Sequence, residues 1–240
     1  MSGTAGDLAV PPFACVSQPD DLPAALKALD IAVRRPVLVL VGGAGGMTPG
    51  HLAATAEVME RIIPALERWG AAVVDGGTDA GVMRVMGQVR AAAGGGLPLV
   101  GVAAEGTVVL PGTAPASHAA PLEPHHTQVI LVPGDDWGDE SRWLSLVATA
   151  IAHGQPSLTL VVNGGQITYD DIEYSLSAGR PVIILAGTGR AADAIAAAAH
   201  GQAENERAAE AAAAPGTQIV SVSDPRALCS AIRSVLTAAS

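Results

Sequence analysis

Short runs of apolar, often β-branched residues alternate with Ala-rich segments of helical spacing along most of the chain. Such alternation is typical of βα units, whose parallel strands are buried on both faces of one sheet. The pattern predicts an α/β fold with about seven strands in a doubly wound, mainly parallel sheet and helices on both faces. The predicted strands are residues 37–41, 71–75, 97–103, 128–132, 157–162, 181–186 and 218–222.

The segments between these strands predict helices, and the chain before residue 37 predicts an edge strand within residues 8–17 and a helix over 20–30. We therefore expect an extension of residues 1–36 packed on a single domain of residues 37–240. Residues 111–127 are rich in Pro, Ala and His and lack helical spacing, which predicts a long surface loop. The other helices are expected at 51–69, 81–93, 140–153, 170–178, 190–213, with a break near His200, and 225–238.

Composition narrows the function classes. Of 240 residues, 49% are hydrophobic, 15% are charged, and none of the apolar runs approaches the roughly 20 residues of a membrane span. The formal net charge is -10 with only 13 Lys and Arg residues, which argues against a general nucleic-acid binder. An anionic ligand would have to be held by backbone groups and a few arginines.

The two cysteines, Cys15 and Cys229, have no spacing typical of a disulfide scaffold or a zinc site. The N-terminus lacks the basic and apolar regions of a signal peptide. We expect a cytoplasmic protein.

Four predicted strands run directly into glycine-rich turns, at residues 42–47, 76–81, 163–165 and 187–190. The carboxyl ends of parallel strands meet at one edge of the sheet, where ligands bind in a crevice. Glycine lets backbone N–H groups approach an anion, and a following helix N-terminus adds partial positive charge. Tight-turn geometry explains a single glycine loop equally well, but four at one edge favour a phosphate or pyrophosphate, and hence a nucleotide-type ligand.

An ordinary NAD dehydrogenase fits poorly. The GxGxxG fingerprint is not met cleanly at residues 42–47, and the nearest acid, Asp75, lies within its own glycine loop.

Polar residues beside the loops leave alternatives open. Thr78 and Asp79 cap a helix or contact the ligand, and Arg190 pairs with a phosphate or with a surface carboxylate. Glu140, at the end of an acidic segment entering a helix, acts as a general base, holds a ribose hydroxyl or stabilises the helix N-terminus. Trp137 is placed to stack on a base.

The adjacent histidines near residue 125 invite a metal interpretation, but no third ligand follows at regular spacing. We therefore expect no metal site. His126 is interpreted as a ligand contact or a neutral hydrogen-bonding residue.

Six segments in order resemble the SLOG superfamily, especially the branch of melastatin-type TRP channels and their stand-alone prokaryotic relatives. They are VLVLVGGAGG, VVDGGTDAGVM, LVGVAAEGTV, HHTQVILVPGDDWGDESRW, LVVNGG and PVIILAGTGRAAD, and the resemblance as a whole spans roughly residues 37–199. The resemblance implies a Rossmann-like fold and recognition of nucleotide-derived ligands such as ADP-ribose. The channel segment has no counterpart in this sequence.

The same superfamily includes phosphoribohydrolases of the "lonely guy" type. Their first glycine motif resembles residues 75–83, whereas their PGGxGTxxE motif matches residues 133–140 only in part, since Asp135 and Asp139 replace Gly and Thr and the Glu comes early. If an N-glycosidic bond were hydrolysed, Glu140 would stabilise the ribosyl centre or activate water, with Asp139 as the second choice.

The leading hypothesis is a sensor-type protein that binds a ligand related to ADP-ribose or NAD. The alternatives are a nucleoside-monophosphate phosphoribohydrolase and an interaction subunit with a vestigial pocket. A homodimer is expected, with no nucleic-acid or membrane partner. The residues expected to bind the ligand are Gly42, Gly43, Gly45, Gly46, Gly76, Gly77, Thr78, Asp79, Gly81, Glu105, Gly106, His126, Gly134, Trp137, Gly138, Asn163, Gly164, Gly187, Thr188, Gly189 and Arg190.

Overall fold

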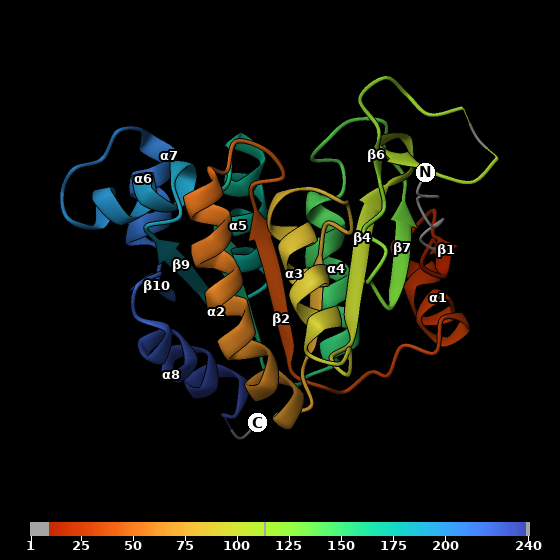
Figure 1. Cartoon of the computed structure of the whole chain (residues 1–240), viewed down its shortest axis with the longest axis horizontal. Helices are drawn as coiled ribbons and strands as arrows, with labels where there is room; N and C mark the ends of the chain where they lie inside the picture. Colours follow the sequence, from red (N-terminus) through yellow and green to blue (C-terminus); the bar gives the residue numbers. More distant parts are fainter. Residues whose placement is uncertain (1–9, 113, 239–240) are drawn as a thin grey trace, which may run out of the picture.

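The computed structural model describes residues 10–112 and 114–238. Its centre is an eight-stranded sheet in the order β1-β7-β4-β3-β2-β8-β9-β10, and every pair of neighbouring strands is parallel (Figure 1). The strands are β1 (Phe13–Cys15), β2 (Val37–Gly42), β3 (Ala72–Asp75), β4 (Leu99–Ala104), β7 (Gln128–Val132), β8 (Ser157–Val162), β9 (Val182–Ala186) and β10 (Thr217–Ser221).

Helices cover both faces of the sheet, as the sequence predicts. Side chains alternate along each strand, so that Val37, Val39 and Val41 of β2 face one core while Leu38 and Leu40 face the other. The first core lies under α1 (Leu22–Ala28), α4 (Ser141–Ala152), α5 (Gln166–Ser177), α6 (Arg190–Ala199) and α7 (Glu206–Ala213). The second lies under α2 (Pro49–Arg68), α3 (Gly81–Ala92) and α8 (Pro225–Leu236).

The order of the strands creates a topological switch point between β2 and β8. From β2 the chain adds β3, β4 and β7 on one side, and then returns to the other side of β2 to add β8, β9 and β10. The loops after β2 and β8 therefore leave the sheet toward opposite faces and open a crevice between them.

The N-terminal segment contributes to the main sheet. Strand β1 pairs in parallel with β7 at the edge, and α1 packs into the first core beside α4. Residues 1–9, which include the start of the expected edge strand, lie outside the described residues.

The break expected near His200 in the helix 190–213 is present, because Gly201 takes a left-handed φ of 80° after α6 and the chain turns before α7. Two other elements differ from the sequence prediction. Helix α5 begins at Gln166, four residues earlier than expected, where Gly165 donates its amide to the Thr168 hydroxyl.

The expected surface loop 111–127 is partly structured. Strand β6 (Ala120–Pro121) pairs with β5 (Val108–Val109), and Leu122 forms a bridge with Thr78. Leu122, Glu123 and His126 are buried, whereas residue 113 lies outside the described part. Within residues 10–112 and 114–238, no helix combines the length and the apolar character needed to cross a membrane.

Candidate functional site

A cavity of about 290 Å³ lies at the switch point, at the carboxyl ends of β2 and β8. This volume is at the small end of the roughly 300–1,000 Å³ typical of small-molecule sites. Its walls come from the loops after β2, β3, β7, β8 and β9. The lining residues are Leu40, Val41, Gly42, Gly43, Ala44, Gly76, Thr78, Met83, Trp137, Glu140, Leu144, Gly165, Gln166, Ile167, Thr168, Asp171 and Arg190.

The loop after β2 is held between β8 and α3. Gly43 donates its amide to the Val162 carbonyl at 3.1 Å, and its own carbonyl accepts the amide of Val82 at 3.1 Å. Gly81 has a φ of 46°, and a Cβ at this position would overlap the Gly43 carbonyl. Only glycine therefore allows α3 to begin so close to the β2 loop.

The loops after β8 and β9 are joined by Asn163 and Thr188, which are both fully buried. Asn163 donates its backbone amide to Thr188 Oγ1 at 2.7 Å and its Nδ2 to the Thr188 carbonyl at 2.6 Å. Its carbonyl accepts the Ala192 amide at 2.9 Å, which occupies part of the α6 N-terminus. These residues, with Gly164 and Gly189, support the cavity from beneath rather than lining it.

Arg190 supplies the cationic group of the cavity. Its backbone has a left-handed φ of 53°, a conformation that is uncommon for a residue with a side chain and is often found at functional sites. Its Nη1 donates to the Gly45 carbonyl at 2.8 Å, and a Cβ on Gly165 would lie 2.8 Å from its Nη2. The guanidinium thus lies between the β2 loop and the first turn of α5.

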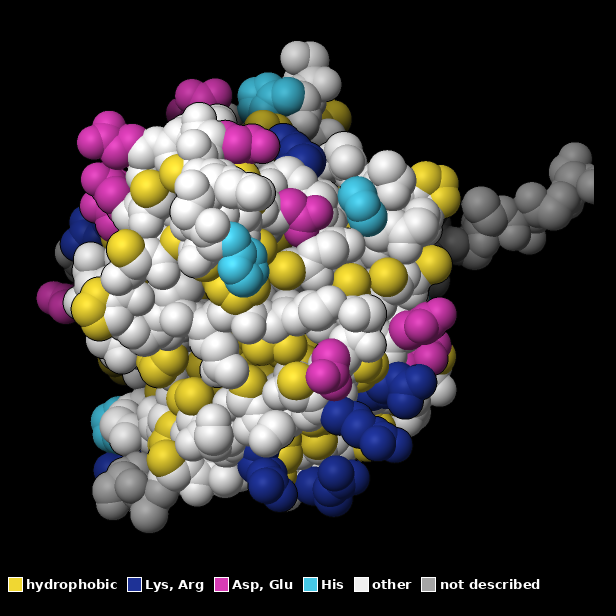
Figure 2. Space-filling model, turned by 90° about the vertical axis from the view of Figure 1, so that its left-hand side faces the viewer, with side chains coloured by type: hydrophobic (Ala, Val, Ile, Leu, Met, Phe, Trp, Pro, Cys, Tyr) yellow, Lys and Arg dark blue, Asp and Glu magenta, His cyan; other side chains and the backbone are white. Residues whose placement is uncertain are grey.

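Arg190 is not part of any ion pair among residues 10–112 and 114–238. On the face shown in Figure 2, Asp and Glu side chains predominate toward the upper end, where the strands have their carboxyl ends, while Lys and Arg gather at the lower end. Long-range charge at this end therefore does not attract an anion, so local groups such as Arg190 must do so.

Two carboxyl groups share the cavity. Glu140 is the residue before α4 and accepts the Gly138 amide at 2.9 Å, and its pKa is raised mainly by burial. Asp171 lies within α5, and burial, together with the charges of Glu140 and Asp170, raises its pKa to about 7, although the Ser141 hydroxyl opposes the shift. Asp171 Oδ1 is buried and makes no hydrogen bond.

Asp171 is a cavity residue that the sequence interpretation missed. The only signal was its position, since it shares a helix face with Thr168 and Ser175, which are buried as well. A carboxylate on the buried face of a helix is uncommon unless it is paired or functional.

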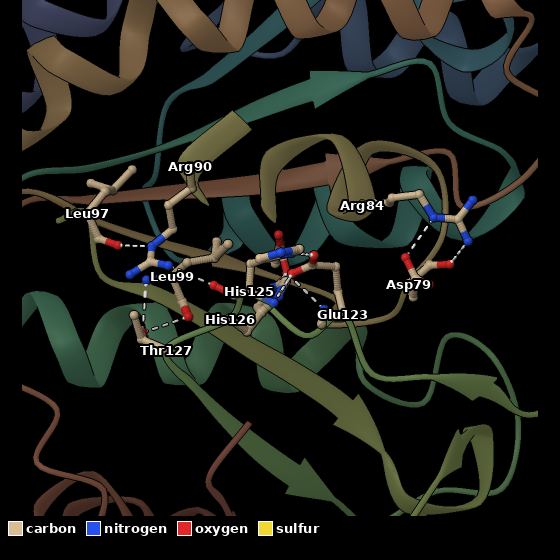
Figure 3. A network of polar contacts seen from close by, with 11 residues as sticks. Asp79, Arg84, Arg90, Leu97, Leu99, Glu123, His125, His126 and Thr127 are labelled. Atoms are coloured by element: carbon tan, nitrogen blue, oxygen red, sulfur yellow. Dashed lines mark hydrogen bonds and ion pairs between the residues drawn. The ribbon is translucent and has the colours of Figure 1, made fainter. Parts of the chain in front are cut away.

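A second polar group is the buried carboxylate–histidine cluster of Asp75, Glu123, His125 and His126. Figure 3 shows Glu123, His125 and His126 of this cluster close together. His126 bonds Asp75 Oδ1 through Nε2 at 2.7 Å and Glu123 Oε2 through Nδ1 at 2.8 Å. His125 Nδ1 lies 2.5 Å from Glu123 Oε1.

Charge balance in this cluster favours a protonated His126. Burial opposes protonation, but Asp75 and Glu123 outweigh it and raise the pKa of His126 to about 9. Burial would likewise raise the pKa of Glu123, but hydrogen bonds from His126 and His125 outweigh it and lower that pKa. The ring is therefore charged at neutral pH, which differs from the neutral hydrogen-bonding residue that was one of the two interpretations of His126.

The cluster positions the loop after β3. Asp75 Oδ1 accepts the Gly77 amide at 2.8 Å, and the Glu123 amide donates to the Gly77 carbonyl at 2.9 Å. Gly76 and Thr78, on either side of Gly77, line the cavity. His126 itself is 5% exposed and does not reach the cavity, so its influence on that site is indirect.

Six of the expected ligand-binding residues line the cavity, together with Glu140, the first choice for a catalytic residue. The six are Gly42, Gly43, Gly76, Thr78, Trp137 and Arg190. The others have different surroundings. Asp79 pairs with Arg84 at 2.6 Å, and Gly77 packs closely against Gly101. Gly187 donates its amide to Asp193 at 2.6 Å.

Residues around the β7–α4 turn mainly shape that turn. Gly106 donates to the Gly134 carbonyl at 2.9 Å, and Asp139 Oδ2 accepts the amides of Asp135 and Asp136 at 3.0 and 3.1 Å. Gly138 packs against Ile167. The remaining expected residues do not line the cavity, and they are Gly45, Gly46, Gly81 and Glu105. Among the described residues, no group of three or more His, Cys, Asp and Glu side chains is arranged to hold a metal ion.

The fold and the cavity define a Rossmann-like α/β protein with a small-molecule cavity at its topological switch point. The chain belongs to the family described as "SLOG in TRPM, prokaryote", whose model matches residues 35–229.

No curated protein matches the sequence. Among solved structures, the molybdenum cofactor carrier protein MCP from Chlamydomonas reinhardtii is similar, with 16% identity and a TM-score of 0.57. The match covers 85% of this chain and 100% of that chain. A likeness at this identity supports the fold alone.

Proposed function

We propose that the cavity binds a phosphate-containing, nucleotide-derived ligand, of which ADP-ribose, NAD and nucleoside monophosphates are the candidates. The phosphate lies between Arg190, the amides of the β2 loop and the first turn of α5. Trp137 and the apolar side chains contact the base, and Glu140 contacts the sugar. The volume of about 290 Å³ favours one enclosed nucleotide unit, with any second unit extending out of the mouth.

The observation that carries this proposal is the unpaired guanidinium of Arg190 beside glycine amides and the start of α5. An unpaired cation over a helix N-terminus repels the helix dipole, whereas an anion placed between them satisfies both. Membership of the SLOG family and the shared fold of a cofactor carrier protein are consistent with a binding role.

Calorimetric titration of the protein with AMP, ADP-ribose and NAD tests the proposal. Arg190→Gln removes charge-assisted hydrogen bonds worth about 1.5–3 kcal/mol, so its Kd should rise roughly 10- to 100-fold. Arg233→Gln is the matched control, since Arg233 is exposed on α8, away from the cavity, and should bind like the wild type. If none of the three nucleotides binds, or if both variants bind equally, the proposal is wrong.

A second candidate function is hydrolysis of the N-glycosidic bond of a nucleoside monophosphate. The observation that favours it is that burial in the cavity wall raises the pKa of Glu140, because a carboxyl that holds its proton more tightly than usual is suited to general acid catalysis. Incubation with AMP followed by chromatography for adenine and ribose 5-phosphate tests it. Turnover that disappears in Glu140→Gln would replace the binding role with catalysis.

The cytoplasmic location and the homodimer remain predictions. Both cysteines are free thiols, which is compatible with a reducing compartment. Sedimentation equilibrium of the whole chain distinguishes a monomer from a dimer.

A further inference from the structure

Asp171 differs from the other buried polar residues of α5 because one of its oxygens is buried at the cavity without a hydrogen bond. The residue is 8% exposed, it lines the cavity, and the oxygen without a partner is Oδ1. Buried polar atoms in proteins nearly always have hydrogen-bond partners. An apolar residue would fill this position at lower cost, so stability does not explain the carboxyl group.

The position of Asp171 fixes which part of a ligand it would meet. It lies six residues beyond Gly165, which is about 9 Å along the helix at 1.5 Å per residue. Gly165 is in contact with the Arg190 guanidinium, so the cation and the carboxyl lie at two ends of one helical wall.

Glu140 reaches the same end of the cavity from α4, which packs beside α5 behind the sheet (Figure 1). Its charge contributes to the raised pKa of Asp171, so the two carboxyl groups are close enough to interact. The cavity is therefore polarised, with Arg190 and backbone amides at one end and two carboxyl groups at the other.

We propose that Asp171 is a specificity-determining residue that, with Glu140, accepts hydrogen bonds from the neighbouring hydroxyl groups of a ribose. The ligand enters with its phosphate toward Arg190 and its sugar toward the two carboxyl groups. This inference rests on the proposed function, and it narrows the ligand to ribonucleotides with a free 2′-hydroxyl. Asp171 lies on α5 and is therefore distinct from Asp75, which ends β3 and is bonded to His126.

Titration of the wild type with AMP and with 2′-deoxy-AMP tests the inference directly. We expect the wild type to bind AMP roughly tenfold more tightly, which corresponds to the loss of one hydrogen bond to a charged group. Asp171→Asn keeps the shape of the side chain and should bind the two nucleotides almost equally. Glu173→Gln is the matched control, because Glu173 is an exposed carboxylate of the same helix and should keep the wild-type preference.

The ratio of the Kd values for 2′-deoxy-AMP and AMP distinguishes a sugar contact of Asp171 from a purely structural role. A change that only loosens α5 weakens both nucleotides alike, whereas loss of a sugar contact removes the difference between them. If AMP is cleaved, the ratio of kcat/KM for the two nucleotides replaces the ratio of Kd.

Each outcome of these titrations either supports or overturns the inference. Equal binding of AMP and 2′-deoxy-AMP by the wild type overturns this inference and leaves the proposed function intact. Binding of neither nucleotide overturns the inference, and it overturns the proposed function as well when ADP-ribose and NAD also fail to bind. Putrescine binding that disappears in Asp171→Asn, without any nucleotide preference, would assign the carboxyl pair to an organic cation and overturn the ribose interpretation.

Discussion

The protonated His126 makes the stability of the folded protein depend on pH in a defined window. Its pKa is raised from 6.5 to about 9, and because the folded state binds the proton more tightly, the stabilisation is fully present below pH 6.5. It is lost as the pH rises toward about 9. The difference between the two pKa values corresponds to about 3 kcal/mol of folding free energy.

The test raises the pH from 6 to 9 and compares the loss of folding free energy in the wild type with that in a variant without the cluster charges. The triple variant Asp75→Asn, Glu123→Gln, His126→Gln keeps polar groups of similar size and removes the three fully buried titrating groups of the cluster. The wild type should lose about 3 kcal/mol more than this variant over the interval. His200→Gln is the control for loss of a histidine, since His200 is exposed at the end of α6, and it should follow the wild type.

Urea unfolding followed by Trp fluorescence gives the free energy of unfolding at each pH. A wild-type stability that stays constant or increases between pH 6.5 and 9 would refute the reasoning. An NMR titration in which the His126 ring loses its proton near pH 6.5 would refute it independently.

Three further changes test the packing that supports the cavity. Gly87→Ala should destabilise the protein by about 1–3 kcal/mol in urea unfolding, because the added Cβ would overlap a carboxylate oxygen of the buried cluster. Gly50→Ala on α2 is the control: its Cβ meets only ordinary contacts, so it should be neutral or slightly stabilising. Arg180→Met should lower the free energy of unfolding by about 1–3 kcal/mol, because Arg180 is 3% exposed and donates hydrogen bonds to buried oxygens of α4. Its control, Arg233→Met at an exposed position, should change that free energy by less than about 0.5 kcal/mol. Asn163→Ala should lower the melting temperature, and Asn163→Gly should recover part of the loss if the left-handed φ of 59° contributes to the cost.

The sequence predicts the sheet well because parallel buried strands have a strong local signal. The run at residues 37–41 is uniformly apolar and ends in glycines, and it becomes the central strand β2 with only one residue added. Convergence of the glycine loops follows from the same pattern, since parallel strands all end at one edge. The local spacing contains this information without any tertiary contact.

The polar partnerships are not visible in the sequence because they join distant segments. His126 meets Asp75 across two strands, and Glu123 comes from a stretch whose Pro and Ala content predicts an exposed loop. Asp171 is buried only because α4 packs against α5, and neither helix alone shows this. Many of the glycines expected to bind the ligand instead allow two backbone segments to approach each other closely. The local sequence does not distinguish this structural role from ligand binding.

The adjacency of β2 and β8 also has a consequence during synthesis. Val37 pairs with Ser157, so about two thirds of the 240 residues must leave the ribosome before the second wall of the cavity exists. A nascent chain that ends before β8 has a strand edge open to solvent and no place for a nucleotide, so a metabolite cannot assist its early folding. Contacts between such distant segments form slowly, and the ligand can stabilise only the product of that last step.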